Sequence, residues 1–496
     1  MKSLRIGLLL LTGSCIFNLA SAQYAEDALR FSQFGLGVGA RSLGMGNAAV
    51  GTVNDYTSLF WNPAGLALEK NFEFSLGMSN NGASNDATYL GLTDNSTKSA
   101  TNLNNIGFVY PIATTRGSLT FGFGFGRISS FNNTASFSAF NPQSSIVQSM
   151  APAPSTDLSG YTNDGLASFL GNNLAFQLFL ADTSTIGGRL LMFPYVTDSV
   201  QQSATILEGG GMNHWTFGGA VEIAKDLTVG MSLNFVSGSY TYDRQFTEQD
   251  VNLVYHYAPP FDFNKFIYES TISSDISGFN ALFGMMLKKQ GRYQIGLTVR
   301  TPTHMDINET FTDDGQSFFK TDNENFRQTY NNQTKYSITS PFVFSGGASV
   351  QLTDWVLLAG DAEYTDWTQM QFDSNDPALV DENHFIQSGM KATWNLRGGA
   401  EVTIWSLGLR LRGGYILNPS PFVGDPSSYD QTYYTGGLGY DLDDNVTLNG
   451  AFALGKMNTF RNNYSYLLPS GQTYTSSTSK EAVNSTNVVV SLSYRF

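Results

Sequence analysis

The sequence is short of the residues on which soluble enzymes and helical membrane proteins depend. It has one cysteine, Cys15, and only four histidines. Charged residues make up 14% of the chain, and no segment after residue 22 approaches the ~18–20 apolar residues of a membrane helix. These shortages argue against thiol or cysteine–metal chemistry and against helical membrane spans.

The first 22 residues predict a secretory signal peptide. Lys2 and Arg5 form a basic start, an apolar run follows, and Ala20-Ser21-Ala22 supplies a small-residue cleavage site. The alternative is a lipoprotein signal cut before Cys15, which the apolar pair Ile16-Phe17 directly behind that cysteine disfavours. On the first reading the mature chain has no cysteine.

The mature chain is strongly acidic. Cleavage after residue 22 removes two of the 27 basic residues and none of the 41 acidic ones, so the net charge becomes 25 − 41 = −16. Nucleic-acid binding needs clustered Lys and Arg, and this balance argues against it.

Glycine and aromatic residues are abundant and lie in short alternating runs. There are 50 Gly, 37 Phe and 24 Tyr, a composition typical of strands joined by many turns. In the last eleven residues, large apolar side chains from Val488 to Phe496 occupy every second position, with smaller or polar ones between them. The segments 119–126, 293–300 and 446–454 repeat this pattern, which predicts strands facing lipid on one side and a lumen on the other.

The spacing of such runs predicts about fourteen strands. Candidate strands lie near 72–80, 103–113, 117–131, 212–223, 227–246, 270–288, 292–312, 334–351, 355–372, 387–403, 406–418, 431–442, 445–458 and 486–496. Tight links are expected at 114–116, 224–226, 289–291, 352–354, 404–405 and 443–444, and the links between them are longer. Alternating short and long connections are typical of outer-membrane barrels, so the expected fold is all-β, a transmembrane antiparallel β-barrel.

Four charged residues are expected on the lumen face. Alternation places Arg397 and Glu401 on one strand, and Arg410 and Arg412 on the next, opposite lipid-facing leucines. Arg or Lys on the lipid face near the midplane costs roughly 2–4 kcal/mol, which favours this assignment. The charges belong either to a solvated interior and plug contacts or to a substrate site.

Residues 23–71 do not alternate. A helix is expected over residues 25–34, followed by a glycine-rich stretch and then Asn62, Pro63, Ala64 and Gly65. Pro63 restricts Asn62 to extended or turn geometry, and Gly65 suits a tight turn. A barrel of this width needs filling or is an open pore. We therefore expect a signal peptide at 1–22, an N-terminal hatch plugging the lumen at 23–71 and a transmembrane barrel at 72–496.

Several motifs resemble the FadL/TodX outer-membrane transport proteins for long-chain fatty acids and other hydrophobic compounds. They lie at residues 39–48 (GARSLGMGNA), 62–66 (NPAGL), 278–303 and 364–367 (YTDW), and at the terminal Phe496, which looks like an outer-membrane assembly signal. Together they span nearly the whole mature chain. The hatch motif itself serves either as a structural turn or in function.

The resemblance implies a fourteen-stranded barrel plugged by an N-terminal hatch. Hydrophobic ligand would be caught at external loops and passed to a site near the N-terminus, where Phe31 and Phe34 are candidate contacts. It would leave sideways through a gap made by an inward kink of the third strand. The stretch 131–180 is either the ligand-catching loop or a disordered one.

Three glycines in the third strand candidate bear on that kink. Gly122, Gly124 and Gly126 either permit the bend or make room for the hatch. The implied partners are a hydrophobic small molecule, outer-membrane lipid and the barrel-assembly machinery, with the protein as a monomer of the Gram-negative outer membrane.

Passive transport of hydrophobic molecules is the first functional hypothesis, with no cofactor or metal. The rival within the same fold is a barrel of the PorV type, a secretion accessory or cargo shuttle that binds proteins. Catalysis is disfavoured because His214, His256, His304 and His384 are widely separated and lack a nucleophile motif or metal-ligand spacing. An open porin is disfavoured by the apolar segment at 23–71.

Overall fold

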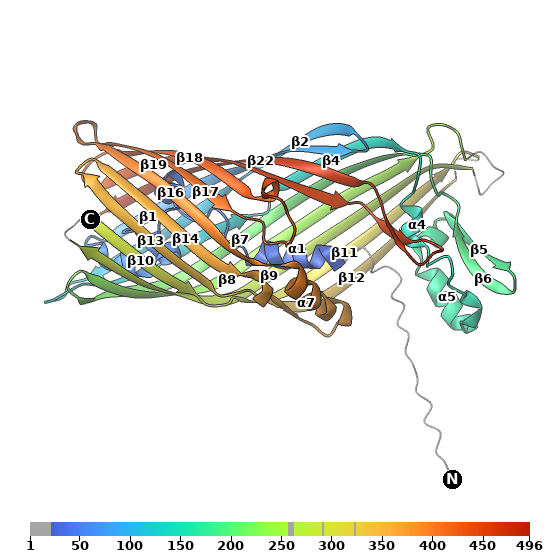
Figure 1. The fold of residues 1–496 in the computed structure, drawn as a ribbon, viewed down its shortest axis with the longest axis horizontal. Helices are drawn as coiled ribbons and strands as arrows, with labels where there is room; N and C mark the ends of the chain where they lie inside the picture. The colour runs from blue at the N-terminus through green and yellow to red at the C-terminus, as the bar shows by residue number, and fades with distance from the viewer. Residues whose placement is uncertain (1–20, 256–261, 290–291, 322–323) are drawn as a thin grey trace, which may run out of the picture.

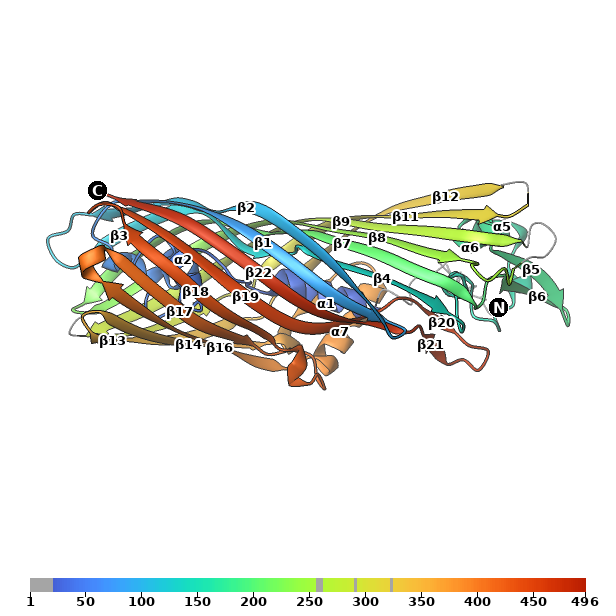
Figure 2. The ribbon, with the colours of Figure 1, turned by 90° about the horizontal axis from the view of Figure 1, so that it is seen from above.

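The computed structural model describes residues 21–255, 262–289, 292–321 and 324–496, which form a closed antiparallel barrel extended at one end by projecting strands (Figures 1 and 2). The main sheet has eighteen strand segments. Four pairs of these are successive parts of one strand, so the wall has 18 − 4 = 14 strands, as expected. Residues 1–20 of the expected signal peptide lie outside the described residues.

The wall strands follow one another around the barrel in chain order. They are β1 (Glu73–Tyr89), β2 (Leu92–Ile112), β3 (Leu119–Ser130) with β4 (Asn133–Asn141), β7 (Val200–Ala224), β8 (Leu227–Gln249), β9 (Phe263–Lys289), β10 (Tyr293–Arg300) with β11 (His304–Phe319), β12 (Asn325–Thr339) with β13 (Val343–Thr353), β14 (Val356–Asp366) with β15 (Gln371–Asp373), β16 (Ala392–Ile404), β17 (Leu409–Asn418), β18 (Gln431–Asp441), β19 (Val446–Asn462) and β22 (Thr478–Arg495). β1 pairs with both β2 and β22, which closes the barrel.

Helices and minor strands lie inside the barrel or at its extended end. Inside are α1 (Ser21–Ser32), α2 (Ala40–Gly44), α3 (Ser58–Trp61) and the 3₁₀ helix η2 (Pro63–Leu68); the remainder are α4 (Val147–Met150), η3 (Leu158–Gly160), α5 (Asn163–Gly171), α6 (Leu174–Gln177), β5 (Ala181–Ile186), β6 (Arg189–Pro194), η4 (Trp367–Gln369), α7 (Pro377–Gly389), η5 (Trp405–Leu407), η6 (Ser427–Tyr429), β20 (Ser465–Leu467) and β21 (Thr473–Thr475). Among the described residues no helix is both long and apolar enough to cross a membrane.

The two ends of the wall meet at the end with the tight turns. The backbone N–H groups of Phe72 and Phe496 each donate to the other's carbonyl, at 3.1 and 3.0 Å, and their rings lie 4.4 Å apart. The six expected tight links are all present between wall strands. The opposite end is therefore the external one, on the rule that long connections face outward.

An apolar belt surrounds the half of the barrel with the tight turns. Its outward-facing, exposed side chains are Leu76, Met78, Phe108, Phe121, Phe123, Trp215, Phe217, Met231, Phe235, Phe279, Phe283, Met285, Leu287, Ile295, Leu297, Phe344, Leu358, Trp394, Leu396, Leu411, Leu438, Leu448, Phe452, Leu454, Val488 and Val490. Exposed aromatic residues, among them Tyr293, Trp355 and Trp405, border it at the tight-turn end. Such a belt with an aromatic margin is the signature of a barrel in a bilayer.

Above the belt the pattern of the wall inverts. On β8 the last exposed apolar side chain is Phe235, and the outward positions that follow, from Ser237 to Gln245, are polar. Inward positions there become apolar, with Tyr240 and Phe246 almost fully buried. This part of the sheet stands in water and keeps its core inside.

The sequence was wrong about the link between the first two strands. Residues 81–102 were expected to be a long external loop, but β1 and β2 continue through them and are joined by Leu90 and Gly91 alone. Both of these residues have positive φ, as a two-residue hairpin turn requires. The strands were missed because they stand above the belt, where neither face alternates in hydrophobicity.

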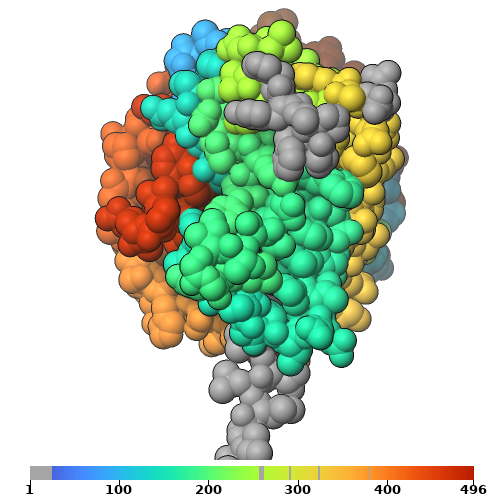
Figure 3. All heavy atoms as spheres, turned by 90° about the vertical axis from the view of Figure 1, so that its right-hand side faces the viewer, coloured from blue at the N-terminus to red at the C-terminus, as the bar shows by residue number. Residues whose placement is uncertain are grey.

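A folded cap of residues 142–199 covers the external end (Figure 3). Its apolar side chains pack with the upper strands in a second core that includes Leu158, Leu178 and Phe246. A carboxylate sits in this core: Glu248 is fully buried and accepts hydrogen bonds from Ser145, from the Ile146 N–H and from Gln202. The stretch 131–180 is thus ordered.

We expect the cap to loosen as pH rises, because burial raises the pKa of Glu248 from 4.5 to about 7. Since the folded pKa lies above the unfolded one, stability is highest below pH 4.5 and falls as the pH rises through 7. The full effect is on the order of 3 kcal/mol. Protease cleavage within 142–199 should be faster at pH about 9 than at about 5. Glu248→Gln should remove the difference, and a wild-type cap equally resistant at both pH values would contradict it.

Candidate ligand passage and lateral window

The hatch motif forms a turn wedged against the wall. Asn62 is fully buried, its Oδ1 accepts from the Ala64 N–H at 3.1 Å, and its Nδ2 donates to the Val50 carbonyl at 2.8 Å. Pro63 opens η2, and a Cβ on Gly65 would lie 2.4 Å from the Val53 carbonyl oxygen. The motif residues therefore hold the plug's own backbone together.

Glycines in the wall leave space for this turn. A Cβ at Gly230 would lie 2.5 Å from Pro63, one at Gly284 would lie 2.1 Å from Asn62, and one at Gly296 would lie 2.0 Å from the Val50 carbonyl oxygen. The plug backbone thus touches β8, β9 and β10 directly. Any side chain at these inward positions would displace it.

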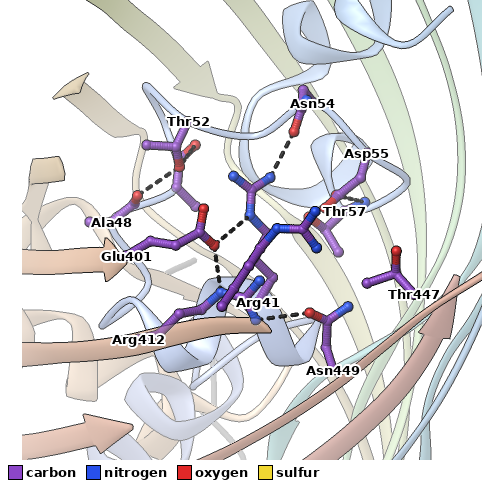
Figure 4. Close-up of polar contacts among 12 residues, drawn as sticks. Arg41, Ala48, Thr52, Asn54, Asp55, Thr57, Glu401, Arg412, Thr447 and Asn449 are labelled. Carbon is purple, nitrogen blue, oxygen red and sulfur yellow. Dashed lines mark hydrogen bonds and ion pairs between the residues drawn. The ribbon is translucent and has the colours of Figure 1, made fainter. Parts of the chain in front are cut away.

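The four predicted charges point inward and form ion pairs, and Figure 4 shows those of Glu401 and Arg412. Glu401 accepts from Arg412 at 2.6 Å and pairs at 3.5 Å with Arg41 of the plug, which also donates to Asn54. The Arg412 guanidinium donates to Asn449 as well. Glu401 thus joins the plug to two wall strands.

The other two arginines are also engaged. Arg397 pairs with Glu363 at 2.9 Å and lies 5.5 Å from the Trp61 ring of the plug. Arg410 forms a bidentate pair with Asp441, with both distances 2.7 Å. These contacts anchor the plug and the wall, and Arg397, Glu401 and Arg412 are buried.

A cavity of about 1120 Å³ runs through the lumen above the plug. Its external mouth is lined by apolar side chains of α7, the 419–430 loop and β19: Phe385, Phe422, Val423, Tyr429 and Phe460. Phe385, Val423 and Phe460 are exposed at 43%, 58% and 44%, although they lie outside the belt. Exposed apolar groups at a cavity mouth are suited to capturing apolar molecules from water.

The inner part of the cavity passes α1 and the loop that follows it, which contain Phe31 and Phe34 respectively. Phe31 is buried, and its ring lies 5.7 Å from Phe131 and 5.8 Å from Tyr240. Phe34 lines the cavity under the Arg300 guanidinium, 4.2 Å above its ring. Phe34 thus lies at the surface of the cavity, whereas Phe31 does not line it and packs against Phe131 and Tyr240, which do.

The third wall strand is interrupted beside this point. The register between β3 and β7 shifts by one residue at Ile128, and β4 resumes only at Asn133. Opposite the break, Gly210 and Gly211 have φ of 98° and 158°, the first a conformation that glycine adopts readily. This is a β-bulge followed by a break, which turns Phe131 into the lumen.

The interruption leaves a gap in the wall, hereafter the window, between β2 and β4. β2 pairs with β3 only from Asn105 onward, and β4 pairs with β7 alone, so residues 92–104 face β4 without a strand ladder among the described residues. Side chains cross the gap instead: Lys98 donates to the Glu208 carbonyl and Asn132 to the Asn81 carbonyl. The window is closed by side chains, which can move, and not by a ladder.

The three glycines of β3 face the plug below the window. A Cβ at Gly122 would lie 3.3 Å from Leu59, at Gly124 2.5 Å from the Tyr56 hydroxyl, and at Gly126 2.6 Å from Phe60. They make room for the plug, and the break begins after them. The sequence signal for the break itself is the run Gly209-Gly210-Gly211 on the neighbouring strand.

The plug also touches the break. The Gly37 N–H donates to the Ile128 carbonyl at 3.1 Å, and a Cβ at Gly35 would lie 2.9 Å from that of Ser129. The loop 35–37 therefore lines the inner cavity beside the window. Sequence reasoning missed Arg127, Lys98 and the mouth residues, because their roles depend on contacts between strands distant in the chain.

The cavity and the window provide a route for a ligand and side chains that can contact it. No group of His, Cys, Asp or Glu able to hold a metal ion occurs among the described residues. Of the histidines, His214 is buried near Phe34, His304 and His384 lie on β11 and α7, and His256 falls outside the described residues.

Solved structures of similar fold include two toluene transporters and a FadL homologue. The chain is similar to the Pseudomonas putida toluene transporter TodX (TM-score 0.54, 13% identity, covering 92% of this chain and 98% of that one) and to a Pseudomonas aeruginosa FadL homologue (0.55, 12%, 93% and 98%). It is also similar to the Ralstonia pickettii toluene transporter TbuX (0.51, 16%, 94% and 100%). At these identities the likeness shows the fold, which confirms the architecture expected from the motifs.

The sequence comparisons add one family model. A model described as BamG matches residues 165–389, which include most of α5 and all of α6, the strands from β5 to β15 and α7. No curated protein is similar enough in sequence to match the chain.

Proposed function

We propose that this protein admits hydrophobic small molecules through the outer membrane by passive diffusion, entering at the apolar mouth and leaving through the window. The observation that carries the proposal is the cavity itself, because it joins exposed apolar residues of the mouth to the break in β3. The toluene transporters and the FadL homologue of the same fold support this substrate class.

The steps follow from the positions of the residues. An apolar molecule leaves water at the mouth, where Phe385 and Val423 offer exposed apolar surface. It then moves past the aromatic side chains of Phe131 and Tyr240 to the loop 35–37. Movement of that loop and of the Lys98 and Asn132 side chains opens the window at the upper edge of the belt, so the ligand enters the bilayer without crossing the plug.

The remaining assignments complete the proposal. Residues 1–22 are a signal peptide, 23–71 the hatch and 72–496 the barrel, assembled by the barrel-assembly machinery and working as a monomer. Fatty acids and monoaromatic hydrocarbons are both candidate ligands. Passive transport needs no catalytic group, cofactor or metal, because the ligand moves down its concentration gradient.

Uptake by cells tests this function. A deletion strain should accumulate radiolabelled oleate or toluene more slowly than the complemented strain. Phe385→Asp at the mouth should lower uptake at limiting concentration about tenfold, equivalent to ~1.4 kcal/mol of lost capture. Val380→Asp is the matched control, because Val380 lies on the same helix with the same 43% exposure but does not line the cavity. Equal uptake by the deletion and complemented strains would refute the proposal.

A further inference from the structure

The free edge of β12, residues 325–335, forms no strand ladder on its outer side in the extracellular part of the sheet. On one side β12 pairs with β11 along its length, from His304 opposite Thr339 to Phe318 opposite Asn325. On the other side, only residues 337–339 are paired, with β15. Within the described residues nothing forms a ladder with the rest, so a row of backbone N–H and C=O groups faces water.

We propose that this free edge binds an extended segment of another extracellular polypeptide, which adds to the sheet as an antiparallel strand. The proposal is independent of small-molecule transport. Main-chain hydrogen bonding to an exposed edge is a general mode of peptide recognition.

The free edge lacks several of the devices that usually protect an edge strand, although Arg327 and Lys335 place charge on it. It contains no proline, its register with β11 has no bulge, and it is longer than the ~5–6 residues of an ordinary strand. Its outward side chains, including Arg327, Thr329 and Asn331, are exposed. In Figure 2 the strand runs at the margin of the sheet beyond the barrel.

One backbone group shows which way the edge points. The Gln333 N–H donates to its neighbour Asn332 through Oδ1, at 2.8 Å. This N–H bonds to an adjacent side chain and not to β11, so it points to the free edge. An incoming strand there can replace the Asn332 side chain as its acceptor. Alternate residues of a strand point their N–H groups to the same side.

A polar groove of about 380 Å³ lies at the lower end of the free edge. It is lined by Asp306 and Asn308 of β11, Lys335 of β12, and Asp373 with the two residues after it. This is where β15 leaves β12. An added strand would continue the line of β15 upward from the membrane, with its first side chains in the groove.

A second copy of this chain does not fit as the occupant. Copies in one membrane are related by rotation about the membrane normal, so their β12 strands point the same way and cannot pair antiparallel. Symmetric antiparallel pairing over the whole edge, centred on Asn331, would also set Arg327 opposite Lys335, and like charges directly opposite are destabilising. The geometry therefore favours a different polypeptide with a β-prone, proline-free segment.

Site-specific photo-crosslinking in intact cells tests the proposal. A benzophenone amino acid replaces Asn331 at the edge or, as control, Thr310 on β11, which pairs with Gln333 but lies one strand further in. We expect adducts from position 331 only, mapping to one segment of another extracellular protein. A synthetic peptide of that segment should then protect amides 325–335 of the purified full-length barrel from hydrogen exchange.

The variant Gln333→Pro should block the addition of a strand, because proline lacks the backbone N–H that residue 333 directs to the free edge. It should abolish the adduct at position 331 while the barrel keeps its resistance to unfolding in detergent. The peptide measurement on the unsubstituted protein decides the question if this variant does not fold. Equal adducts at both positions, adducts only to lipid or to a second copy, no adduct, or a peptide that leaves the amides unprotected would overturn the proposal.

Discussion

Oxidising the double variant Gly35→Cys with Ser129→Cys should stop uptake of the labelled hydrocarbon, and a reductant should restore it. The one native cysteine, Cys15, lies in the expected signal peptide, so we expect the engineered bond to be the only disulfide formed. A Cβ at position 35 lies 2.9 Å from the Ser129 Cβ, near enough for a bond after a small outward shift. The bond fastens the loop 35–37 to the break in β3, and we expect uptake to fall at least about tenfold, an increase in barrier of ~1.4 kcal/mol.

A second engineered disulfide is the control for the effect of cross-linking the plug to the wall. Gly44→Cys with Gly437→Cys ties the plug to β18, where a Cβ at Gly44 would lie 3.2 Å from the Gly437 Cα. That contact is away from the window, so oxidation there should leave uptake unchanged. Undiminished uptake with the 35–129 bond formed, or equal losses with both bonds, would show that ligand does not pass this loop.

Gly296→Val should dislodge the plug. The new Cβ would lie 2.0 Å from the Val50 carbonyl oxygen and 2.8 Å from the Asn62 amide nitrogen. Val50 cannot yield easily, because its N–H donates to Asp361 at 2.8 Å and its carbonyl accepts from Asn62 at the same distance. Overpacking plus the loss of these bonds should cost about 3 kcal/mol or more.

The consequences of this substitution are measurable in cells and in detergent. The thermal midpoint should drop, and cells should become sensitive to vancomycin because the lumen is no longer filled. Gly450→Val is the matched control, since nothing lies within 4 Å of a Cβ at that position in β19. Identical midpoints for Gly296→Val and Gly450→Val would contradict the account of the plug's seat.

The sequence located the barrel best where its wall meets lipid. From Leu119 to Phe125, and from Val488 to Phe496, outward apolar residues alternate with inward small or polar ones, and the strands lie there as expected. Above the belt water lies outside, so apolar residues move inward and alternation weakens. The upper halves of β1 and β2 were therefore mistaken for loop.

The candidate site was less accessible to prediction. The inward direction of Arg397 and Glu401 follows from the cost of charge in lipid, but their partners Glu363 and Arg41 come from a distant strand and from the plug. The glycines of β3 drew attention to the correct strand, although the break lies beyond Gly126. A break depends on the opposite strand, and its positive-φ glycines at 210 and 211 carry no periodic signal.

Anomalous diffraction from crystals grown with a brominated hydrocarbon, such as 4-bromotoluene, tests the central claim most directly. The bromine peak should lie in the lumen cavity, between the mouth and the loop 35–37, near Phe131 and Tyr240. In the oxidised variant with Gly35→Cys and Ser129→Cys, the bromine peak should remain on the cavity side of that loop. Bromine peaks confined to the outer surface of the belt, with an empty lumen in both forms, would contradict passage through the barrel.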